Sequence, residues 1–142
     1  AVYNKGTVNE QSIKTITTKE KKVINEDNEK TVDVIVAKIY YNGKNGNAKK
    51  FAEEMVSSGT VNKIRAEAGN LRYEYFFPMD DEETVLLIDS WKDQESIDIH
   101  HASPMMEQIS KLREKYELHM KVERYVSDET GIPDSDKVFI KD

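Results

Sequence analysis

The sequence contains no cysteine, so it has no disulfide bond, no thiolate metal ligand and no cysteine nucleophile. It also lacks any run of about 18 apolar residues, which predicts that no helix crosses a membrane. No signal peptide is visible. We therefore expect a cytoplasmic protein; an exported mature form stays open, because the chain begins with Ala1 rather than Met.

Basic residues are in deficit as well. Lys and Arg number 21 against 27 Asp and Glu, and the formal net charge is −6. An acidic surface disfavours nucleic acid and anionic lipid, so we expect neither a nucleic-acid partner nor a membrane partner. The P-loop, GxGxxG, GxSxG and HExxH motifs are missing, which disfavours nucleotide binding, serine hydrolysis and zinc proteolysis.

What is present is the pattern of one α+β domain, the size that 142 residues suggest. Apolar, β-branched and aromatic runs predict strands over 32–41, 70–77, 84–91 and 118–126. Helical spacing predicts one helix over 47–68, which Ser57-Ser58-Gly59 kinks or splits and Gly69-Asn70 caps. Asp93 is expected to cap a short helix and Pro104 to begin another.

This order is the ferredoxin-like βαββαβ arrangement, a four-stranded antiparallel sheet with helices on one face. A bare apolar sheet face needs a cover, and a second copy is the simplest one. We therefore expect a homodimer through the sheet faces, forming a dimeric α/β barrel.

Two extensions flank this domain, which we place at 32–126. In the N-terminal extension, 1–31, the spaced apolar residues Ile13, Ile16 and Val23-Ile24 predict a peripheral strand or hairpin, with a turn over 26–30. In the C-terminal tail, 127–142, the patch Val138-Phe139-Ile140 is expected to dock as an added strand.

Two stretches resemble the antibiotic-biosynthesis-monooxygenase family: EAGNLRYEYFFP (67–78) and LLIDSWKDQESIDIHHASPMM (86–106). The family pattern is acid-x-Gly-x-x-x-Tyr entering the second strand, acid-x-Trp ending the third, then a histidine about nine residues on and a Ser-Pro. The resemblance spans about 32–126. The matching positions here are Glu67, Gly69, Tyr73, Asp89, Trp91, His100, Ser103 and Pro104.

This resemblance implies a dimer and a choice of activities. Family members oxidise quinols and polyketide phenols without a cofactor, degrade haem, or isomerise a small phosphorylated sugar-like signal. We favour a cofactor-independent monooxygenase that acts on a small aromatic molecule with O2. An isomerase or lyase on the same scaffold, and a non-catalytic dimeric small-molecule-binding module, stay open. Haem degradation is disfavoured because the middle of the first strand, Val36 to Ile39, lacks the asparagine of the haem-degrading relatives.

The resemblance and the chemistry of the side chains nominate a site. His100, or its neighbour His101, would be the general base, because histidine titrates near neutral pH. Each candidate has a structural alternative in core packing, hydrogen bonding or capping, and for Glu67 and Asp89 salt bridging or capping is the commoner role. Adjacent histidines on a helix point about 100° apart and His119 is far along the chain, so no metal site is expected. The candidate substrate-binding residues are Trp91, Tyr73, Tyr75, Asn70 and Met105.

Overall fold

The computed structural model describes residues 23–25, 30–32 and 34–141. In the N-terminal extension, β1 (Val23–Asn25) pairs antiparallel with β2 (Lys30–Val32). Of the residues expected to form strands or a turn there, Ile13, Ile16 and 26–29 lie outside the described residues, and the domain boundaries stay predictions.

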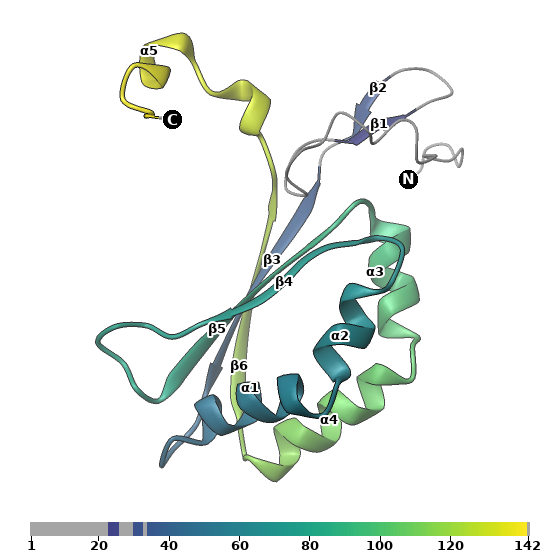
Figure 1. The fold of residues 1–142 in the computed structure, drawn as a ribbon, viewed down its shortest axis with the longest axis vertical. Coiled ribbons are helices and arrows are strands. Elements are labelled where there is room, and N and C mark those ends of the chain that lie inside the picture. The colour runs from purple at the N-terminus through teal and green to yellow at the C-terminus, as the bar shows by residue number, and fades with distance from the viewer. Residues whose placement is uncertain (1–22, 26–29, 33, 142) are drawn as a thin grey trace.

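The main sheet has four antiparallel strands in the order β4-β5-β3-β6 (Figure 1). The two central strands, β3 and β5, are not consecutive in the sequence but pair with each other. On its other edge β3, the first strand of this sheet, pairs with β6, the last one. This is the ferredoxin-like topology, so the predicted fold class is confirmed. The strands are β3 (Ile35–Asn42), β4 (Asn70–Phe76), β5 (Thr84–Trp91) and β6 (His119–Val126).

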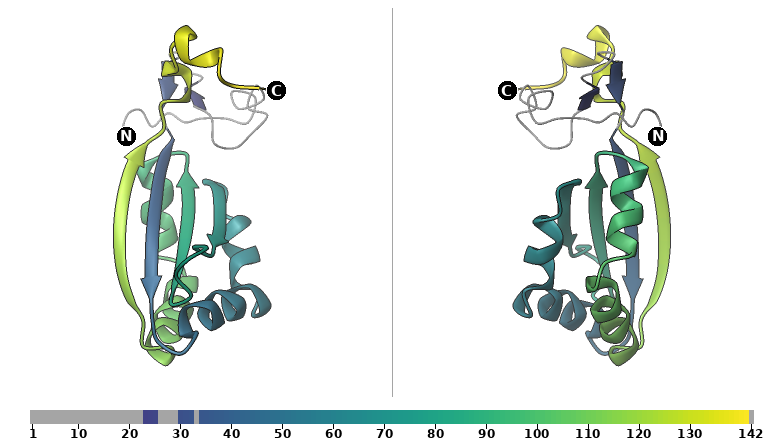
Figure 2. Two further views of the ribbon diagram at one scale, coloured as in Figure 1. Left: turned by 90° about the vertical axis from the view of Figure 1, so that its left-hand side faces the viewer. Right: turned by 90° about the vertical axis from the view of Figure 1, so that its right-hand side faces the viewer.

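Four helices cover one face of this sheet, and the left panel of Figure 2 looks onto the other face. They are α1 (Asn47–Ser57), α2 (Thr60–Arg65), α3 (Gln94–His101) and α4 (Met105–Lys115). The predicted break is confirmed: Gly59, with φ of 83°, separates α1 from α2. The left-handed region to which this φ belongs suits glycine because it has no Cβ.

The C-terminal cap predicted at Gly69-Asn70 is wrong. The second helix ends at Arg65, and Ala66 follows it in right-handed helical geometry. Gly69 does not adopt a positive φ. Its small size serves packing instead, as the site below shows.

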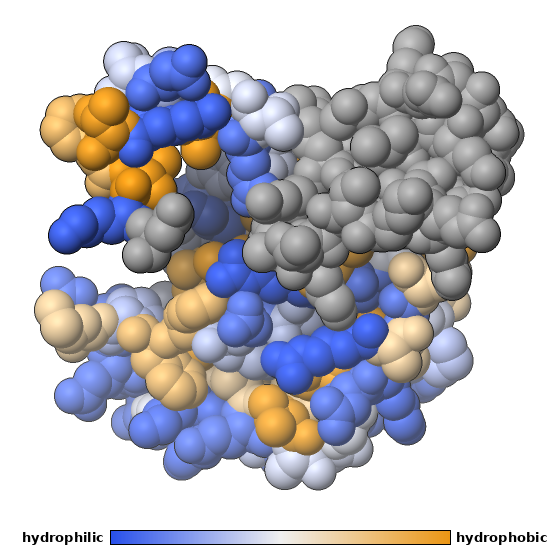
Figure 3. All heavy atoms as spheres, turned by 45° about the horizontal axis from the view of Figure 1, so that its top comes forward, coloured by the Kyte–Doolittle hydropathy of each residue, from blue (hydrophilic) through white to orange (hydrophobic). Residues whose placement is uncertain are grey.

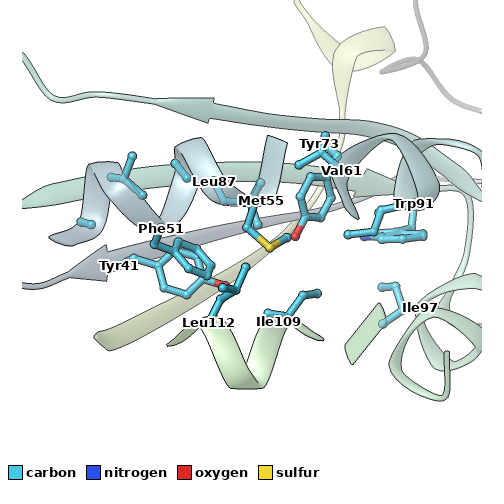
Figure 4. Close-up of a cluster of buried hydrophobic side chains, with 14 of the residues drawn as sticks. Tyr41, Phe51, Met55, Val61, Tyr73, Leu87, Trp91, Ile97, Ile109 and Leu112 are labelled. Atoms are coloured by element: carbon cyan, nitrogen blue, oxygen red, sulfur yellow. The ribbon is translucent and has the colours of Figure 1, made fainter. Parts of the chain in front are cut away.

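The core lies between the helices and the sheet (Figure 4). Alternate residues of a strand point to the same face, so every second residue of β3 and β5 faces the helices. Among these, Tyr41, Leu87 and Trp91 are buried, and Phe51 and Met55 meet them from α1. Ile109 and Leu112, which are buried on α4, complete this layer.

The C-terminal tail does not add a strand, so that expectation is wrong. It forms η2 (Glu129–Gly131) and α5 (Asp134–Lys137), which project beyond the sheet (Figure 1). Val138, Phe139 and Ile140 are exposed, Phe139 to 85%, and hydrophobic atoms gather over this segment at the upper left of Figure 3. Among the described helices, none is long and apolar enough to cross a membrane.

Candidate functional site

The nominated base, His100, is buried at the end of α3 and has a carboxylate partner. Its Nδ1 lies 2.7 Å from Oε2 of Glu67, in the connection between α2 and β4. Burial lowers the pKa of His100, while the hydrogen bond and charge of Glu67 raise it, and the net shift is downward. A neutral ring that donates from Nδ1 to Glu67 carries its lone pair on Nε2, so the pair favours the tautomer of a general base.

Gly69 explains how α3 comes close enough for this contact. A Cβ at Gly69 would overlap Oγ and Cβ of Ser96, in the first turn of α3. Asp93 caps that turn, as predicted: its Oδ1 accepts from the backbone N–H of Ser96 at 2.8 Å. The backbone N–H of Lys92 donates to the Gly69 carbonyl at 3.0 Å, so the helix start is bound to this segment. Glycine therefore sets the distance between the elements that carry His100 and Glu67.

Trp91 links the histidine to a second carboxylate, Asp89, which is buried. The rings of Trp91 and His100 lie 4.6 Å apart between centroids, tilted by 33°. On the indole edge, Nε1 donates to Oδ2 of Asp89 at 2.7 Å. Burial raises the pKa of Asp89 to about 6, and the hydrogen bond from Trp91 partly opposes that shift. An acid with such a pKa changes its charge close to neutral pH, which suits proton transfer.

Two tyrosines of β4, Tyr73 and Tyr75, lie beside Asp89 of β5. Tyr73 pairs across the strands with Asp89, and Tyr75 pairs with Leu87, so both face the helices. Their rings meet edge to face, 5.9 Å apart. Burial raises the pKa of both phenols above the ordinary value, so both stay protonated at neutral pH. Arg65 fixes this strand by donating from Nε and Nη2 to the Tyr73 carbonyl, at 3.0 and 2.7 Å.

In a regular strand Asn70 would lie on the face opposite to Tyr73 and Tyr75, and that expectation is wrong: Asn70 joins their face. A register shift between Asn70 and Arg72 places Asn70 opposite Trp91 and Tyr73 opposite Asp89. The bulge changes which face the first residue of β4 presents, because it adds a residue on one strand only. Asn70 is buried, and its Nδ2 donates to the Arg72 carbonyl at 3.1 Å.

The other nominated residues lie further out. His101 is exposed, with its ring centroid 5.7 Å from that of His100, and Met105 is half-buried against the core. His119 lies on β6 and is exposed. Within the described part of the chain, no three His, Cys, Asp or Glu side chains are grouped as metal ligands.

The Trp91 ring lies against the His100 ring. An open groove of about 800 Å³ lies elsewhere, between α4 and β6, where Arg113, Leu118, His119 and Met120 contribute to its lining. None of the residues nominated from the sequence lines it.

Two carboxylates, Glu67 and Asp89, were considered from the sequence but not nominated. The structure brings both into hydrogen-bonding contact with nominated side chains. The signal that identifies them is the spacing acid-x-Gly and acid-x-Trp, because the glycine marks the close helix approach and the tryptophan marks the carboxylate's donor.

The model of the family called antibiotic biosynthesis monooxygenase matches residues 34–112, more than half of the chain. The chain belongs to this family. The match includes Glu67, Asp89, Trp91 and His100, so all four side chains lie inside the family region. No match to the chain was found among the curated proteins.

Solved structures share the fold of this family member. A conserved protein from Bacteroides thetaiotaomicron VPI-5482 superposes with a TM-score of 0.60 at 16% identity, over 68% of this chain and 99% of that one. PA3566 from Pseudomonas aeruginosa gives 0.59 at 21% identity, over 68% and 95%. SnoaB, a cofactor-independent oxygenase from Streptomyces nogalater, gives 0.57 at 10% identity, over 68% and 94%. At these identities the likeness supports the fold alone.

Proposed function

We propose that this family member is a cofactor-independent monooxygenase that oxidises a small phenol or quinol with O2. The observation that carries the proposal is the buried arrangement of two proton acceptors around one indole. His100 stacks on Trp91, whose Nε1 bonds Asp89. Buried acids and bases with shifted pKa values concentrate at sites of proton chemistry. The family and the fold of SnoaB agree with a role of this type.

In the proposed reaction, His100 takes the hydroxyl proton of the substrate, and Glu67 stabilises the imidazolium that forms. The phenolate then passes one electron to O2, giving a phenoxyl radical and superoxide. These two radicals join at a ring carbon as a peroxide, which takes up a proton. Loss of water from this hydroperoxide leaves a carbonyl, so one oxygen atom enters the substrate and the other leaves as water.

A second candidate function is a non-catalytic binding module, which the sequence analysis left open. The close contact of the buried His100 ring with Trp91 favours it, because packing and the bond to Glu67 already give His100 a structural role. An isomerase or lyase would use the same two proton acceptors without consuming O2.

The assembly is proposed to be a homodimer through the sheet faces. On the face away from the helices, Tyr40, Leu86 and Ile88 are half-buried in the single chain, and Phe76 is exposed at 37%. Burying such apolar side chains against a second copy is favourable. Sedimentation velocity tests this: a dimer that Leu86→Glu dissociates supports the interface, and a monomeric wild-type protein contradicts it.

The deciding experiment is oxygen consumption by the purified protein given a panel of quinols and polycyclic phenols. We expect uptake with a subset of the panel, at one O2 per product formed, and a loss of at least about 100-fold in His100→Ala. His119→Ala is the matched control, since this exposed histidine lies on β6, and it should retain the wild-type rate. No uptake above the buffer rate with any substrate would contradict the monooxygenase proposal and favour the alternatives.

A further inference from the structure

The residues after β6 form an arm that carries exposed apolar side chains away from the sheet. This C-terminal arm, residues 127–141, contains η2 and α5 and projects beyond the end of β6 (Figure 1). Its Val138, Phe139 and Ile140 are exposed to 75%, 85% and 56%. The family model matches residues 34–112, so the arm lies outside the family region. Adjacent apolar side chains with this exposure indicate a surface that binds another molecule.

A second exposed apolar surface lies at the tip of the β4–β5 hairpin. In this hairpin tip, residues 77–83, Phe77 is exposed to 53% and Met79 to 99%. Four acidic residues, 80–83, follow directly, and all four are exposed. Apolar side chains next to a run of negative charge suit a partner that is apolar and positively charged.

The C-terminal arm has that character. Lys137 and Lys141 stand on either side of its apolar residues, in the order Lys-Val-Phe-Ile-Lys. Lys137 already pairs with Asp134 of α5, at 3.4 Å between Nζ and Oδ1. Lys141 follows the apolar residues and is exposed. The arm therefore complements the hairpin tip in apolar surface and, through Lys141, in charge.

Within one chain the C-terminal arm and the hairpin tip lie at opposite ends of the sheet. Val126, the last residue of β6, pairs with Ile35, whose other partner is Trp91. The hairpin tip ends where Thr84 pairs with Asn42, at the other end of the same strands. Eight residues of strand separate the two ends, a length of about 26 Å. The arm and the tip therefore meet most simply between two copies.

We propose that the C-terminal arm of each copy docks on the hairpin tip of a second copy. A two-fold axis in the plane between the sheets and perpendicular to the strands reverses one sheet end for end. It brings each arm to the other copy's hairpin tip and closes the assembly as a dimer.

The inference rests on the proposed homodimer and adds the segment that fastens it. Phe76, on the sheet face of that interface, pairs with Leu86 and is followed directly by Phe77 of the hairpin tip, so the two contacts are continuous. Specific interfaces bury about 800 Å² per partner, more than three side chains supply. The arm therefore strengthens a dimer that the sheet faces begin.

Cross-linking tests the contact directly, because the chain has no cysteine of its own. Val138→Cys puts a thiol on the arm and Met79→Cys puts one on the hairpin tip. The two full-length variants are mixed, allowed to exchange subunits and treated with a short bismaleimide. We expect a covalent dimer that contains one copy of each variant, identified by mass spectrometry. The matched control is Val138→Cys mixed with Asp98→Cys, an exposed position on α3, and it should give no linked dimer.

The dissociation constant of the dimer, measured by sedimentation over a dilution series, gives a second readout. Phe139→Ser should raise it at least about tenfold, because burial of a phenylalanine side chain is lost. Val56→Ser is the matched control: this apolar residue of α1 is exposed to 57% but lies in the helix layer, and the constant should not change. Lys141→Glu should raise the constant about threefold or more at low salt, and added salt should reduce this effect.

These results separate the inference from the proposed sheet-face dimer. A dimer that Leu86→Glu dissociates, with no arm-to-tip link and no effect of Phe139→Ser, would overturn the inference alone. A linked dimer that persists in Leu86→Glu would support the arm contact and contradict the sheet-face interface. Linking in Val138→Cys alone would show that the arms meet each other, and a linked monomer of the Val138→Cys/Met79→Cys double variant would show docking within one chain. Either result contradicts the inference, as does a monomeric wild-type protein, which contradicts both proposals.

Discussion

Gly69→Ala tests whether close helix packing holds His100 beside Glu67. The added Cβ would overlap both Oγ and Cβ of Ser96. Ser96 cannot rotate away freely, because it is buried and both its Oγ and its backbone N–H donate to Oδ1 of Asp93, at 2.6 and 2.8 Å. The start of α3 must therefore move outward. Overpacking of this kind costs about 1–3 kcal/mol of unfolding free energy, and the melting temperature should fall by about 3–10 °C.

The assay is a double-mutant cycle measured by chemical denaturation. Ser96→Gly removes the two atoms nearest to the new Cβ and leaves the Ser96 Cα, at 3.4 Å. We expect the double variant to lose less stability than the two single changes added together, with a coupling of about 1–2 kcal/mol. Gly59→Ala is the control: nothing lies within 4 Å of its Cβ, but its φ of +83° is strained for alanine. Ser96→Gly should not relieve that strain.

Additive losses in the Gly69/Ser96 cycle would refute the packing argument. A second readout concerns the site itself, since Trp91 is the sole tryptophan of the chain. Its emission should change in Gly69→Ala, because α3 carries the His100 ring that stacks on it. An unchanged spectrum together with an intact cycle coupling would mean that α3 moves without disturbing His100.

The remaining predictions concern Asp89, the pair of Glu67 with His100, and the hydrogen bonds that Arg65 donates to β4. Because folding raises the pKa of Asp89 to about 6 from 3.8, the folded state binds more protons than the unfolded state between these values, and stability falls as pH rises through this window. Asp89→Asn should therefore gain on the order of 2–3 kcal/mol over the wild type between pH 4 and 7 by denaturant unfolding, and a constant difference across this range would refute the assignment. Glu67→Gln should lower the pKa of His100 further in an NMR titration, since Glu67 raises it; an upward shift would contradict the contact. Arg65→Lys loses one of the two hydrogen bonds to the Tyr73 carbonyl and should lower the free energy of unfolding by about 1 kcal/mol. An unchanged free energy of unfolding would show that the second hydrogen bond does not stabilise the fold.

Much of the fold is predictable because local patterns and global topology agree in this chain. The run Thr84 to Trp91 is a strand, Asp93 is a cap, and the break at Gly59 falls where Ser57-Ser58-Gly59 interrupts the helical spacing. The tail failed as a strand prediction because Val138-Phe139-Ile140 is too short to select strand over turn without a neighbour to pair with.

The candidate site was predictable as a set of residues but not as a set of contacts. The motif spacings identified His100, Trp91, Glu67 and Asp89 as members of one pattern. They could not show which carboxylate meets which ring, because Glu67 and His100 are 33 positions apart and meet only through packing. A bulge likewise moved Asn70 to the helix-facing side, and no periodicity predicts a bulge.

By itself, the sequence determined the order of strands and helices, the lack of thiol chemistry and the family pattern, since these depend on residue type and on spacing along the chain. Only the tertiary structure decided that Gly69 acts through its size rather than its φ and that the Asp89 carboxyl is buried against Trp91. The physical reason is that burial and hydrogen bonding are set by what packs from distant parts of the chain, and these neighbours are assembled only when α3 closes over the sheet.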